Sequence, residues 1–524
     1  MFMDNLKSTM ENESNISVTE NGAVGYRTTG KALLDLNFAI ASLRQAKDSD
    51  IINRFEMAYA EDKNLAMKWL FYARDIRGGV GERRLFRVIL KHMVNDHYAE
   101  IKHLIPLVAE YGRWDDLWVL LTTKAKNQVA SIIKEQLAED LSHMRNKQPV
   151  SLLAKWLPSA KGNKSKSAEK NARLVLELIG MTRKEYNRTL SKLRKYLKIV
   201  ERDMCANRWE AINYEAVPSR ANLIYNSAFL RHDESRRRNF LSAVNRGEKK
   251  INSSTLFPHD IVYQYNSYYK EDAGIEALWK ALPDTVKGCG NTIVVADGSG
   301  SMFTRVDSHS GVQAIHVANA LAIYFAERSS GQFKDKYITF SMSPQLVDLS
   351  KGKSLKDKIL IAKRYNEAAN TNIEAVFDLI LKTAVQNHME QKDLPNNILI
   401  VSDMEFDTCA GSNHYDPYNY HAIRNNGLPN NLFKEIENRY VAAGYKIPRM
   451  VFWNVCSRTG TIPVKENDLG VALVSGFSVN IVKMVMSNKT DPFECLVETL
   501  MSERYAQITV KNQSTTKVKV VKKK

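Results

Sequence analysis

The sequence predicts two architectures in one chain, an all-α helical module followed by an α/β domain in which helices wrap a parallel sheet. From Leu33 to about Leu282, apolar residues recur at helical spacing in segments of roughly 12 to 24 residues, without strand patterns. From Asn291, short apolar strands alternate with helices over roughly 220 residues, which is typical of a parallel sheet. The change of pattern places the boundary near residue 287.

Amphipathic helices separated by short polar breaks fill the first module. The clearest is expected over Thr182–Cys205, where Thr182 and Glu185 have the spacing of a capping box that binds otherwise unpaired amides. Its apolar residues form one stripe, namely Tyr186, Leu190, Leu193, Leu197, Val200 and Met204. At about 100° per residue, a row of cations falls almost opposite this stripe, namely Lys184, Arg188, Lys195 and Arg202. Further helices are expected over Asn64–Asp75, Arg83–Asn95, Trp114–Thr122 and Gln128–Met144.

Strands and helices alternate in the second half. The expected strands are Thr292–Ala296, Tyr337–Phe340, Asn397–Ser402, Arg449–Val455 and Gly470–Val474, and the expected helices are Val312–Arg328, Asn372–Gln386 and Leu432–Ala443. The expected organisation is a disordered tail over residues 1–22, the helical module over residues 23–287, the α/β domain over residues 288–510 and a basic tail over residues 511–524.

Composition excludes several classes of protein. The 524 residues are 44% hydrophobic and 25% charged, and no apolar run reaches the roughly 20 residues that a bilayer-spanning helix needs. The N-terminus lacks the apolar core of a secretory signal, so a cytoplasmic location is expected. The five cysteines are scattered without a C-x-x-C pair, which favours reduced, buried thiols over a zinc site.

The basic charge is concentrated in one segment. The chain carries a formal net charge of +17, and residues 121–250 hold 28 Lys or Arg against 13 Asp or Glu, which leaves +15 in that segment. Such a block favours a polyanionic partner, with nucleic acid the first candidate and an anionic membrane surface the second. Solvated helix faces are the alternative explanation. The candidate nucleic-acid-binding residues are Lys184, Arg188, Lys195, Arg202, Arg236, Arg237 and Arg238.

A second candidate site follows the first strand of the α/β domain. Asp297, Ser299 and Ser301 alternate with glycines in a tight turn, at the strand end where parallel sheets bind ligands. Asp403 ends another strand in the same sense, and Thr371 precedes a helix. This all-oxygen set suits Mg²⁺ or another divalent cation, which favours few protein ligands and several waters. A polar turn that caps a helix is the alternative for the first three residues.

This constellation resembles the metal-ion-dependent adhesion site (MIDAS) of von Willebrand factor A domains. The D-x-S-x-S motif, a later Thr and a later Asp match Asp297, Ser299, Ser301, Thr371 and Asp403. The resemblance implies a Rossmann-like α/β fold. It also implies a Mg²⁺ ion bound by the hydroxyls directly and by the aspartates mostly through water, with an acidic group of a partner protein completing the shell.

Five further segments resemble a family that joins a TROVE-like helical module, as in the Ro ribonucleoprotein, to a von Willebrand factor A domain. They are TENGAVGYRTTGKALLDL (19–36), RGGVGERRLF (77–86), EYGRWDDLW (110–118), VPSRANLIYNSAFLRHD (217–233) and SDMEFD (402–407). The resemblance implies HEAT-like repeats closed into a ring that binds RNA.

The sequence therefore predicts a non-enzymatic, cytoplasmic RNA-binding protein with a Mg²⁺-dependent ligand site and no membrane partner. The alternative is a Mg²⁺-dependent protein-interaction scaffold without RNA. Catalysis is not expected, because metal-dependent nucleases usually bring more carboxylates than this hydroxyl-rich set.

Overall fold

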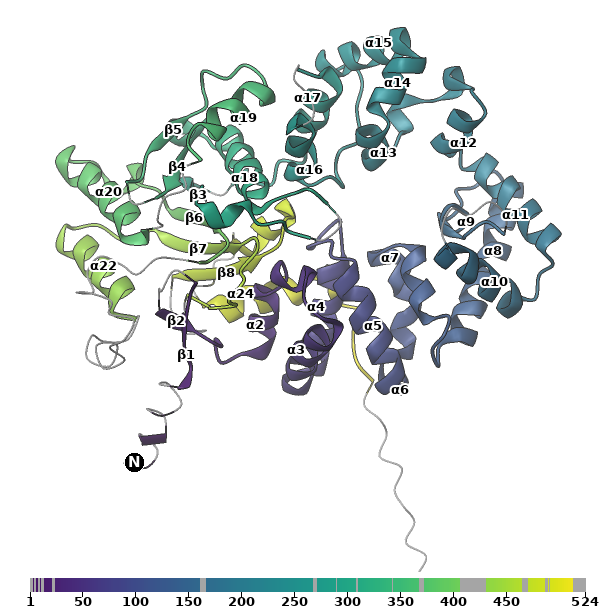
Figure 1. The fold of residues 1–524 in the computed structure, drawn as a ribbon, viewed down its shortest axis with the longest axis horizontal. Coiled ribbons are helices and arrows are strands. Elements are labelled where there is room, and N and C mark those ends of the chain that lie inside the picture. Colours follow the sequence, from purple (N-terminus) through teal and green to yellow (C-terminus); the bar gives the residue numbers. More distant parts are fainter. Residues whose placement is uncertain are drawn as a thin grey trace, which may run out of the picture. The chain divides into compact units, whose positions relative to one another are not determined.

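The computed structural model describes residues 14–20, 24–160, 166–266, 271–288, 290–307, 310–341, 343–366, 372–405, 430–463, 470–485 and 491–511, with a few single positions besides. The chain divides into two compact units, each built from segments distant in sequence (Figure 1). The first unit comprises residues 1–61, 77–80 and 212–502, and the second comprises residues 62–76, 81–211 and 503–524. The sequence-based boundary near residue 287 lies inside the first unit, and the domain ranges stay a prediction.

The second unit is helical. Its elements are α4 (Lys63–Arg74), α5 (Arg84–Asp96), α6 (Tyr98–Ile101), η2 (Lys102–Leu107), α7 (Val108–Tyr111), η3 (Trp114–Leu120), α8 (Lys126–Arg145), α9 (Leu153–Trp156), α10 (Lys166–Ile179), α11 (Arg183–Tyr196), α12 (Val200–Cys205), η4 (Trp209–Ala211) and η11 (Glu503–Tyr505). Helix α4 packs on α5, and α8 packs on α9, α10 and α11. The N-terminal half is thus helix-rich, as the sequence predicts.

Helix α11 confirms the predicted cap and corrects the predicted length. The Thr182 and Glu185 side chains accept hydrogen bonds from each other's backbone amides at 3.3 and 3.0 Å. The helix ends at Tyr196, so the single helix expected over Thr182–Cys205 is wrong. Lys198 adopts a left-handed backbone with φ of 49°, and α12 begins only at Val200. A left-handed residue cannot continue a right-handed α-helix, so Lys198 separates α11 from α12.

The first unit contains a six-stranded mixed sheet in the order β5-β4-β3-β6-β7-β8. Its strands are β3 (Thr292–Asp297), β4 (Lys336–Phe340), β5 (Leu346–Asp348), β6 (Asn397–Ser402), β7 (Arg449–Asn454) and β8 (Val471–Ser475). All pairs are parallel except β4 with β5, so the expected parallel sheet carries one antiparallel edge strand. Strands β3 and β8 are buried along their whole length, because helices cover both faces of such sheets.

Helices surround this sheet and extend the first unit (Figure 1). They are α2 (Ala32–Phe38), α3 (Asp48–Glu61), α13 (Ser219–Ile224), α14 (Asn226–His232), α15 (Glu234–Asn245), α16 (Pro258–Val262), α17 (Ala273–Lys280), α18 (Ala314–Arg328), α19 (Leu355–Lys363), α20 (Ile373–Gln386), α22 (Asn430–Ala442), α23 (Val482–Val485) and α24 (Pro492–Leu500). Near the N-terminus, β1 (Ile16–Val18) and β2 (Val24–Tyr26) form an antiparallel hairpin. Strand β1 falls within residues 1–22, the segment that the sequence predicts to be disordered. Across the described residues, no helix has both the length and the apolar character needed to cross a bilayer.

The strand order contains one switch point, at which later strands are added on the opposite side of β3. From β3 the chain continues to β4 on one side, and later returns to place β6 on the other side of β3. The loops after β3 and β6 therefore leave in opposite directions at the carboxyl ends of these two strands. Ligands of open α/β sheets bind at such a point.

Candidate functional site

Asp297 and Ser402 join the ends of β3 and β6. Asp297 is the last residue of β3, and the register that pairs Ala296 with Val401 brings it opposite Ser402. The Ser402 hydroxyl donates to Asp297 Oδ2 at 2.6 Å, and the Ser299 amide donates to Asp297 Oδ1 at 2.9 Å. Asp297 is only 1% exposed. These two hydrogen bonds therefore hold its carboxylate at the carboxyl ends of β3 and β6.

Two serine hydroxyls converge beside Asp297. The chain turns after β3 and enters a 3-10 helix, η7, over Gly300–Phe303. This turn brings the hydroxyls of Ser299 and Ser301 to 2.9 Å from each other. The structure thus brings together the three residues of this loop that the sequence predicts as oxygen ligands, namely Asp297, Ser299 and Ser301.

Asp403 supplies the second carboxylate of the site. It follows β6 directly and is 1% exposed. Its Oδ1 accepts a hydrogen bond from the Glu405 amide at 3.3 Å. Its Oδ2 is buried without a hydrogen-bond partner among the described residues, and its ion-pair contact with an Arg458 nitrogen is long, at 3.6 Å. Burial, followed by the neighbouring Asp297 carboxylate, raises the pKa of Asp403 to about 7.

These observations fit a divalent cation. Two buried carboxylates close to each other are costly to ionise, because each loses its hydration and repels the other. A cation removes both penalties and supplies the missing partner of Asp403 Oδ2. The carboxylates of Asp297 and Asp403 and the hydroxyls of Ser299 and Ser301 would hold it, and all are hard oxygen ligands.

The fifth predicted ligand, Thr371, lies outside the described residues. Its neighbour Asn372 is described and caps α20, because its side chain accepts a hydrogen bond from the Ala375 amide at 3.1 Å. The sequence pattern around Thr371 therefore does mark a helix start.

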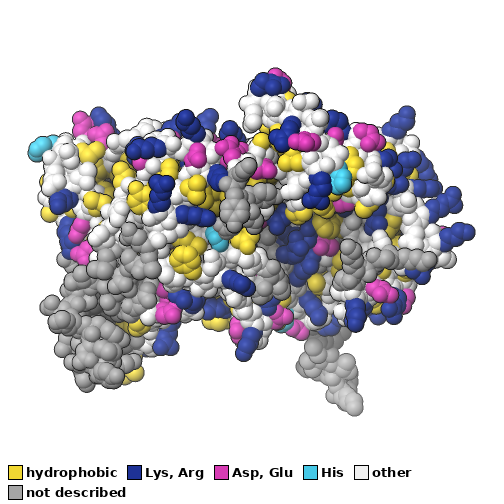
Figure 2. All heavy atoms as spheres, turned by 45° about the horizontal axis from the view of Figure 1, so that its top comes forward, with side chains coloured by type: hydrophobic (Ala, Val, Ile, Leu, Met, Phe, Trp, Pro, Cys, Tyr) yellow, Lys and Arg dark blue, Asp and Glu magenta, His cyan; other side chains and the backbone are white. Residues whose placement is uncertain are grey.

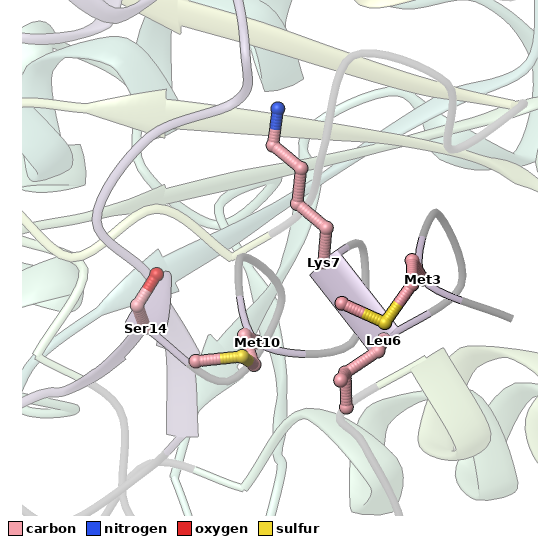
Figure 3. Close-up of a pocket in the computed structure, with 5 residues that line it drawn as sticks. All are labelled: Met3, Leu6, Lys7, Met10 and Ser14. Atoms are coloured by element: carbon pink, nitrogen blue, oxygen red, sulfur yellow. The ribbon is translucent and has the colours of Figure 1, made fainter.

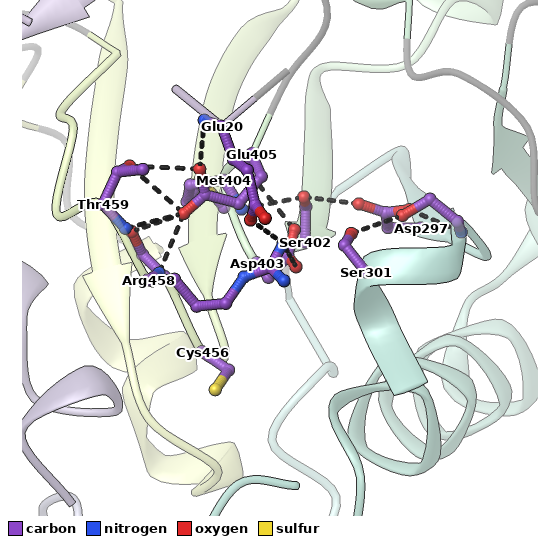
Figure 4. A network of polar contacts seen from close by, with 12 residues as sticks. Glu20, Asp297, Ser301, Ser402, Asp403, Met404, Glu405, Cys456, Arg458 and Thr459 are labelled. Carbon is purple, nitrogen blue, oxygen red and sulfur yellow. Dashed lines mark hydrogen bonds and ion pairs between the residues drawn. The ribbon is translucent and has the colours of Figure 1, made fainter. Parts of the chain in front are cut away.

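Sequence reasoning missed three residues around the site. Ser402 orients Asp297, and its position at the end of the predicted strand β6 could have indicated this role. Glu405, 1% exposed, accepts hydrogen bonds from the Arg458, Thr459 and Glu20 amides at 2.8, 2.9 and 2.9 Å (Figure 4). Arg458 also forms an ion pair with Glu20 at 2.6 Å. Nothing in the sequence marks Arg458, because it comes from a loop far along the chain.

The predicted cations of α11 lie largely in solvent. Lys184, Arg188 and Lys195 are exposed, whereas Arg202 of α12 is half-buried and donates to the Ser191 carbonyl at 2.9 Å. Figure 2 shows Lys and Arg side chains gathered at its right-hand edge, the side on which Figure 1 draws α10 and α11. The second unit therefore carries a basic surface around α11.

The three predicted arginines of α15 belong to the first unit and are engaged there. Arg236 and Arg238 form ion pairs with Asp233 and Glu234, both at 2.8 Å. Arg237 is fully buried, and its guanidinium donates to the side-chain oxygens of Asn222 and Asn226 at 3.1 and 3.0 Å. A buried guanidinium cannot reach a phosphate, so Arg237 is removed from the candidate RNA contacts.

A pocket near the N-terminus offers no comparable chemistry. It is lined by Met3, Leu6, Lys7, Met10 and Ser14 (Figure 3). None of these five described residues is a His, Cys, Asp or Glu, so the pocket lacks the usual metal ligands.

Comparison with known proteins corrects the family that the motifs suggested. The family model described as Domain of unknown function (DUF2828) matches residues 19–129 and 126–292, and the one described as Domain of unknown function (DUF7788) matches residues 291–524. These are not the Ro, TROVE or von Willebrand factor A families, so the resemblance to those families is wrong as an assignment. Short motifs such as D-x-S-x-S and helical segments alike only in type do not identify a family.

A viral protein is similar along nearly the whole chain. It is the "Uncharacterized protein L728" of Acanthamoeba polyphaga mimivirus, which is 30% identical over 528 residues covering 93% of this chain and 87% of the viral protein. With the two matched models, this similarity shows that the chain belongs to the family described as Domain of unknown function (DUF2828), joined to a C-terminal region that matches the DUF7788 model.

Proposed function

We propose that this protein is a non-enzymatic binding protein that holds Mg²⁺, or another divalent cation, at Asp297, Ser299, Ser301 and Asp403. The bound metal would take an acidic side chain of a partner protein as a further ligand. One observation carries the proposal, namely the buried Asp403 Oδ2 without a hydrogen-bond partner among the described residues, beside a second buried carboxylate.

The donor set supports binding of a partner through the metal. Mg²⁺ prefers six oxygen ligands and keeps several waters when the protein supplies few. A carboxylate from a partner can replace one of these waters. The sequence predicts Thr371 as a fifth protein ligand. Even with Thr371 bound, one of the six positions around Mg²⁺ would stay open for a partner.

The surroundings favour binding over hydrolysis. Metal-dependent phosphoryl transfer usually draws on further carboxylates that hold a second ion. Glu405 is the next carboxylate along the chain, and backbone amides of Arg458, Thr459 and Glu20 already occupy it. It is therefore engaged as a structural anchor and is not free to bind a second metal. Phosphoryl chemistry at this site stays the less favoured alternative.

RNA binding by the second unit is the second candidate function. Its support is the exposed row of Lys184, Arg188 and Lys195 on α11, within the segment that carries most of the net charge. Cations spaced along one helix face can contact successive phosphates of a nucleic acid. The three arginines of α15 do not add to this support, because they are paired or buried.

Calorimetric titration of the purified full chain with MgCl₂, with MnCl₂ in parallel, tests the metal site. We expect one cation per chain, and we expect Asp403→Asn to weaken binding by about a hundredfold, because it removes a buried charged ligand. Asp348→Asn is the matched control, because Asp348 is an exposed aspartate elsewhere on the same sheet. Equal binding by the wild type and Asp403→Asn would overturn the proposed function.

A further inference from the structure

We propose that the second unit holds a binding site for a phosphate dianion at Arg83, Arg87 and Arg113. The site lies in the helical unit and uses none of the metal-binding residues, so it goes beyond the proposed function. It is also separate from the exposed row of α11.

Two aspartates fix the guanidinium groups in place, Asp116 fully buried and Asp115 partly exposed. Asp116, fully buried, accepts from Arg87 Nε at 2.6 Å, from Arg74 Nε at 2.7 Å and from the Arg113 amide at 2.9 Å. The second aspartate, Asp115, accepts on one oxygen from Arg87 at 2.9 Å and from Arg113 at 3.0 Å. Arg74 lies in α4 and Arg87 in α5, whereas the two aspartates lie in η3, directly after Arg113. The arginines are therefore pre-organised by a rigid frame.

The cluster holds more guanidinium groups than aspartates. Four guanidinium groups, those of Arg74, Arg83, Arg87 and Arg113, act on one another, whereas two carboxylates oppose them. Arg83 makes no ion pair or side-chain hydrogen bond with any residue that the structure describes, although it is exposed to solvent. The surrounding protein takes water from part of the Arg83 guanidinium, and this partial desolvation, followed by the neighbouring Arg113 charge, lowers the pKa of Arg83 to about 10.

Arg113 is held by stacking as well as by ion pairing. Its guanidinium lies over the Trp156 ring, 4.0 Å from the ring centroid, and Nε lies 3.0 Å from Asp115 Oδ1. Stacking on an aromatic face fixes the plane of a guanidinium and leaves its edges to bind oxygen atoms. Arg113 therefore uses one edge for Asp115 and keeps its remaining nitrogen for another acceptor.

A phosphate dianion matches this arrangement. The four guanidinium groups outnumber the two aspartates that hold them, and a phosphate monoester or inorganic phosphate carries close to two negative charges near neutral pH. Guanidinium forks bind phosphate oxygens with charge-assisted hydrogen bonds, and several can share one tetrahedral anion. Arg83, without a described partner and open to solvent, would be the residue that closes on the ligand.

Titration of the full chain with inorganic phosphate at low ionic strength, followed by calorimetry, tests the site. We expect Arg83→Gln to weaken phosphate binding by about tenfold or more, and Arg83→Lys to recover only part of the loss, because lysine keeps the charge without the fork. Arg246→Gln is the matched control, since it removes one arginine charge from an exposed pair in the first unit. Arg83 has no described partner to lose, so the variant is expected to fold, and circular dichroism checks this.

A second arm identifies the source of the phosphate. Two single-stranded RNA oligonucleotides of one sequence, with a 5′-phosphate or a 5′-hydroxyl, are compared on the wild type and on Arg83→Gln. A preference for the 5′-phosphate that Arg83→Gln abolishes supports the site and assigns it to RNA ends. Phosphate binding without that preference supports the site for a small phosphate compound. Failure of the wild type to bind phosphate, or equal binding by Arg83→Gln, overturns the proposal, and EDTA leaves either result unchanged because no metal takes part.

Discussion

Ser402 donates a 2.6 Å hydrogen bond to Asp297 Oδ2, which links the carboxyl ends of two neighbouring parallel strands. Both groups are buried. One oxygen of Asp297 is therefore occupied by Ser402, and the carboxylate is held in one orientation beside the serine hydroxyls of the next loop. Loss of a residue that orients a metal ligand in this way typically weakens metal binding by about 10- to 100-fold.

Ser402→Ala is expected to weaken Mg²⁺ binding by about tenfold, because Asp297 loses the donor that fixes its orientation. It should also lower the free energy of unfolding by about 1–3 kcal/mol, since a buried carboxylate oxygen loses its partner. Titration calorimetry and urea unfolding measure the two effects. Ser329→Ala, which removes a hydroxyl at the end of α18, serves as the control. Unchanged Mg²⁺ affinity in Ser402→Ala would exclude an orienting role.

The sequence allowed much of the sheet and part of the site to be predicted. Strand β6 has the predicted bounds, because a run of buried apolar residues between polar ends has few other interpretations. Asp297 and Asp403 come together because carboxyl ends of adjacent parallel strands meet. Arg458 could not be foreseen, because its contact with Asp403 depends on a loop that the sequence does not pair with β6.

The helical half shows the other limit of sequence reasoning. A charge pattern does not distinguish a solvated arginine from a buried one. Arg236, Arg237 and Arg238 are adjacent in the sequence, yet only Arg237 turns inward, because the helix period places it on the apolar face of α15 beside Phe240 and Leu241. The predicted long helix breaks at Lys198 because this residue adopts a left-handed backbone. A glycine would have indicated such a conformation in the sequence, and a lysine does not.

Acid should destabilise the first unit through two histidines. Burial lowers the pKa of His259 to about 4 and also that of His316 to about 4. An unfolded histidine titrates near 6.5, so the unfolded chain binds more protons between pH 6.5 and 4, and stability falls as the pH drops through this window. His259, 5% exposed, should account for about 3 kcal/mol of this loss. Urea unfolding across the window measures the slope.

His259→Leu tests whether His259 causes the dependence of the unfolding free energy on pH. His259→Leu removes the titrating group from its position against the Phe257 and Phe477 rings. We expect its stability to depend less on pH than that of the wild type between pH 6.5 and 4. A slope equal to that of the wild type would show that other groups cause the acid sensitivity.

RNA affinity, if the α11 surface binds RNA, should depend steeply on salt. Each phosphate contact with a single strand contributes a slope of about −0.7 in a plot of log affinity against log salt. Reversing Lys184, Arg188 and Lys195 to Glu should reduce that slope by about 2 and lower the affinity at every salt concentration. Fluorescence anisotropy with a labelled single-stranded RNA measures both. Reversal of Lys249 and Lys250, which follow the C-terminal end of α15 in the first unit, is the control. A salt-independent affinity would contradict RNA binding by this surface.

Arg237 and Arg238 should differ sharply as stability determinants although they are neighbours in the sequence. Arg237 is enclosed by the rings of Tyr214, Phe229 and Phe240 at 5.1 to 5.5 Å, and its removal leaves two asparagine oxygens without a donor. Arg237→Ala should therefore cost about 3 kcal/mol or more of unfolding free energy, through the cavity and the unpaired oxygens together. Arg238→Ala breaks only an exposed pair with Glu234 and should change stability by less than about 0.5 kcal/mol. Guanidinium unfolding of both variants measures the difference. Equal effects would mean that Arg237 is not the structural residue that its burial indicates, and would return it to the candidate RNA contacts.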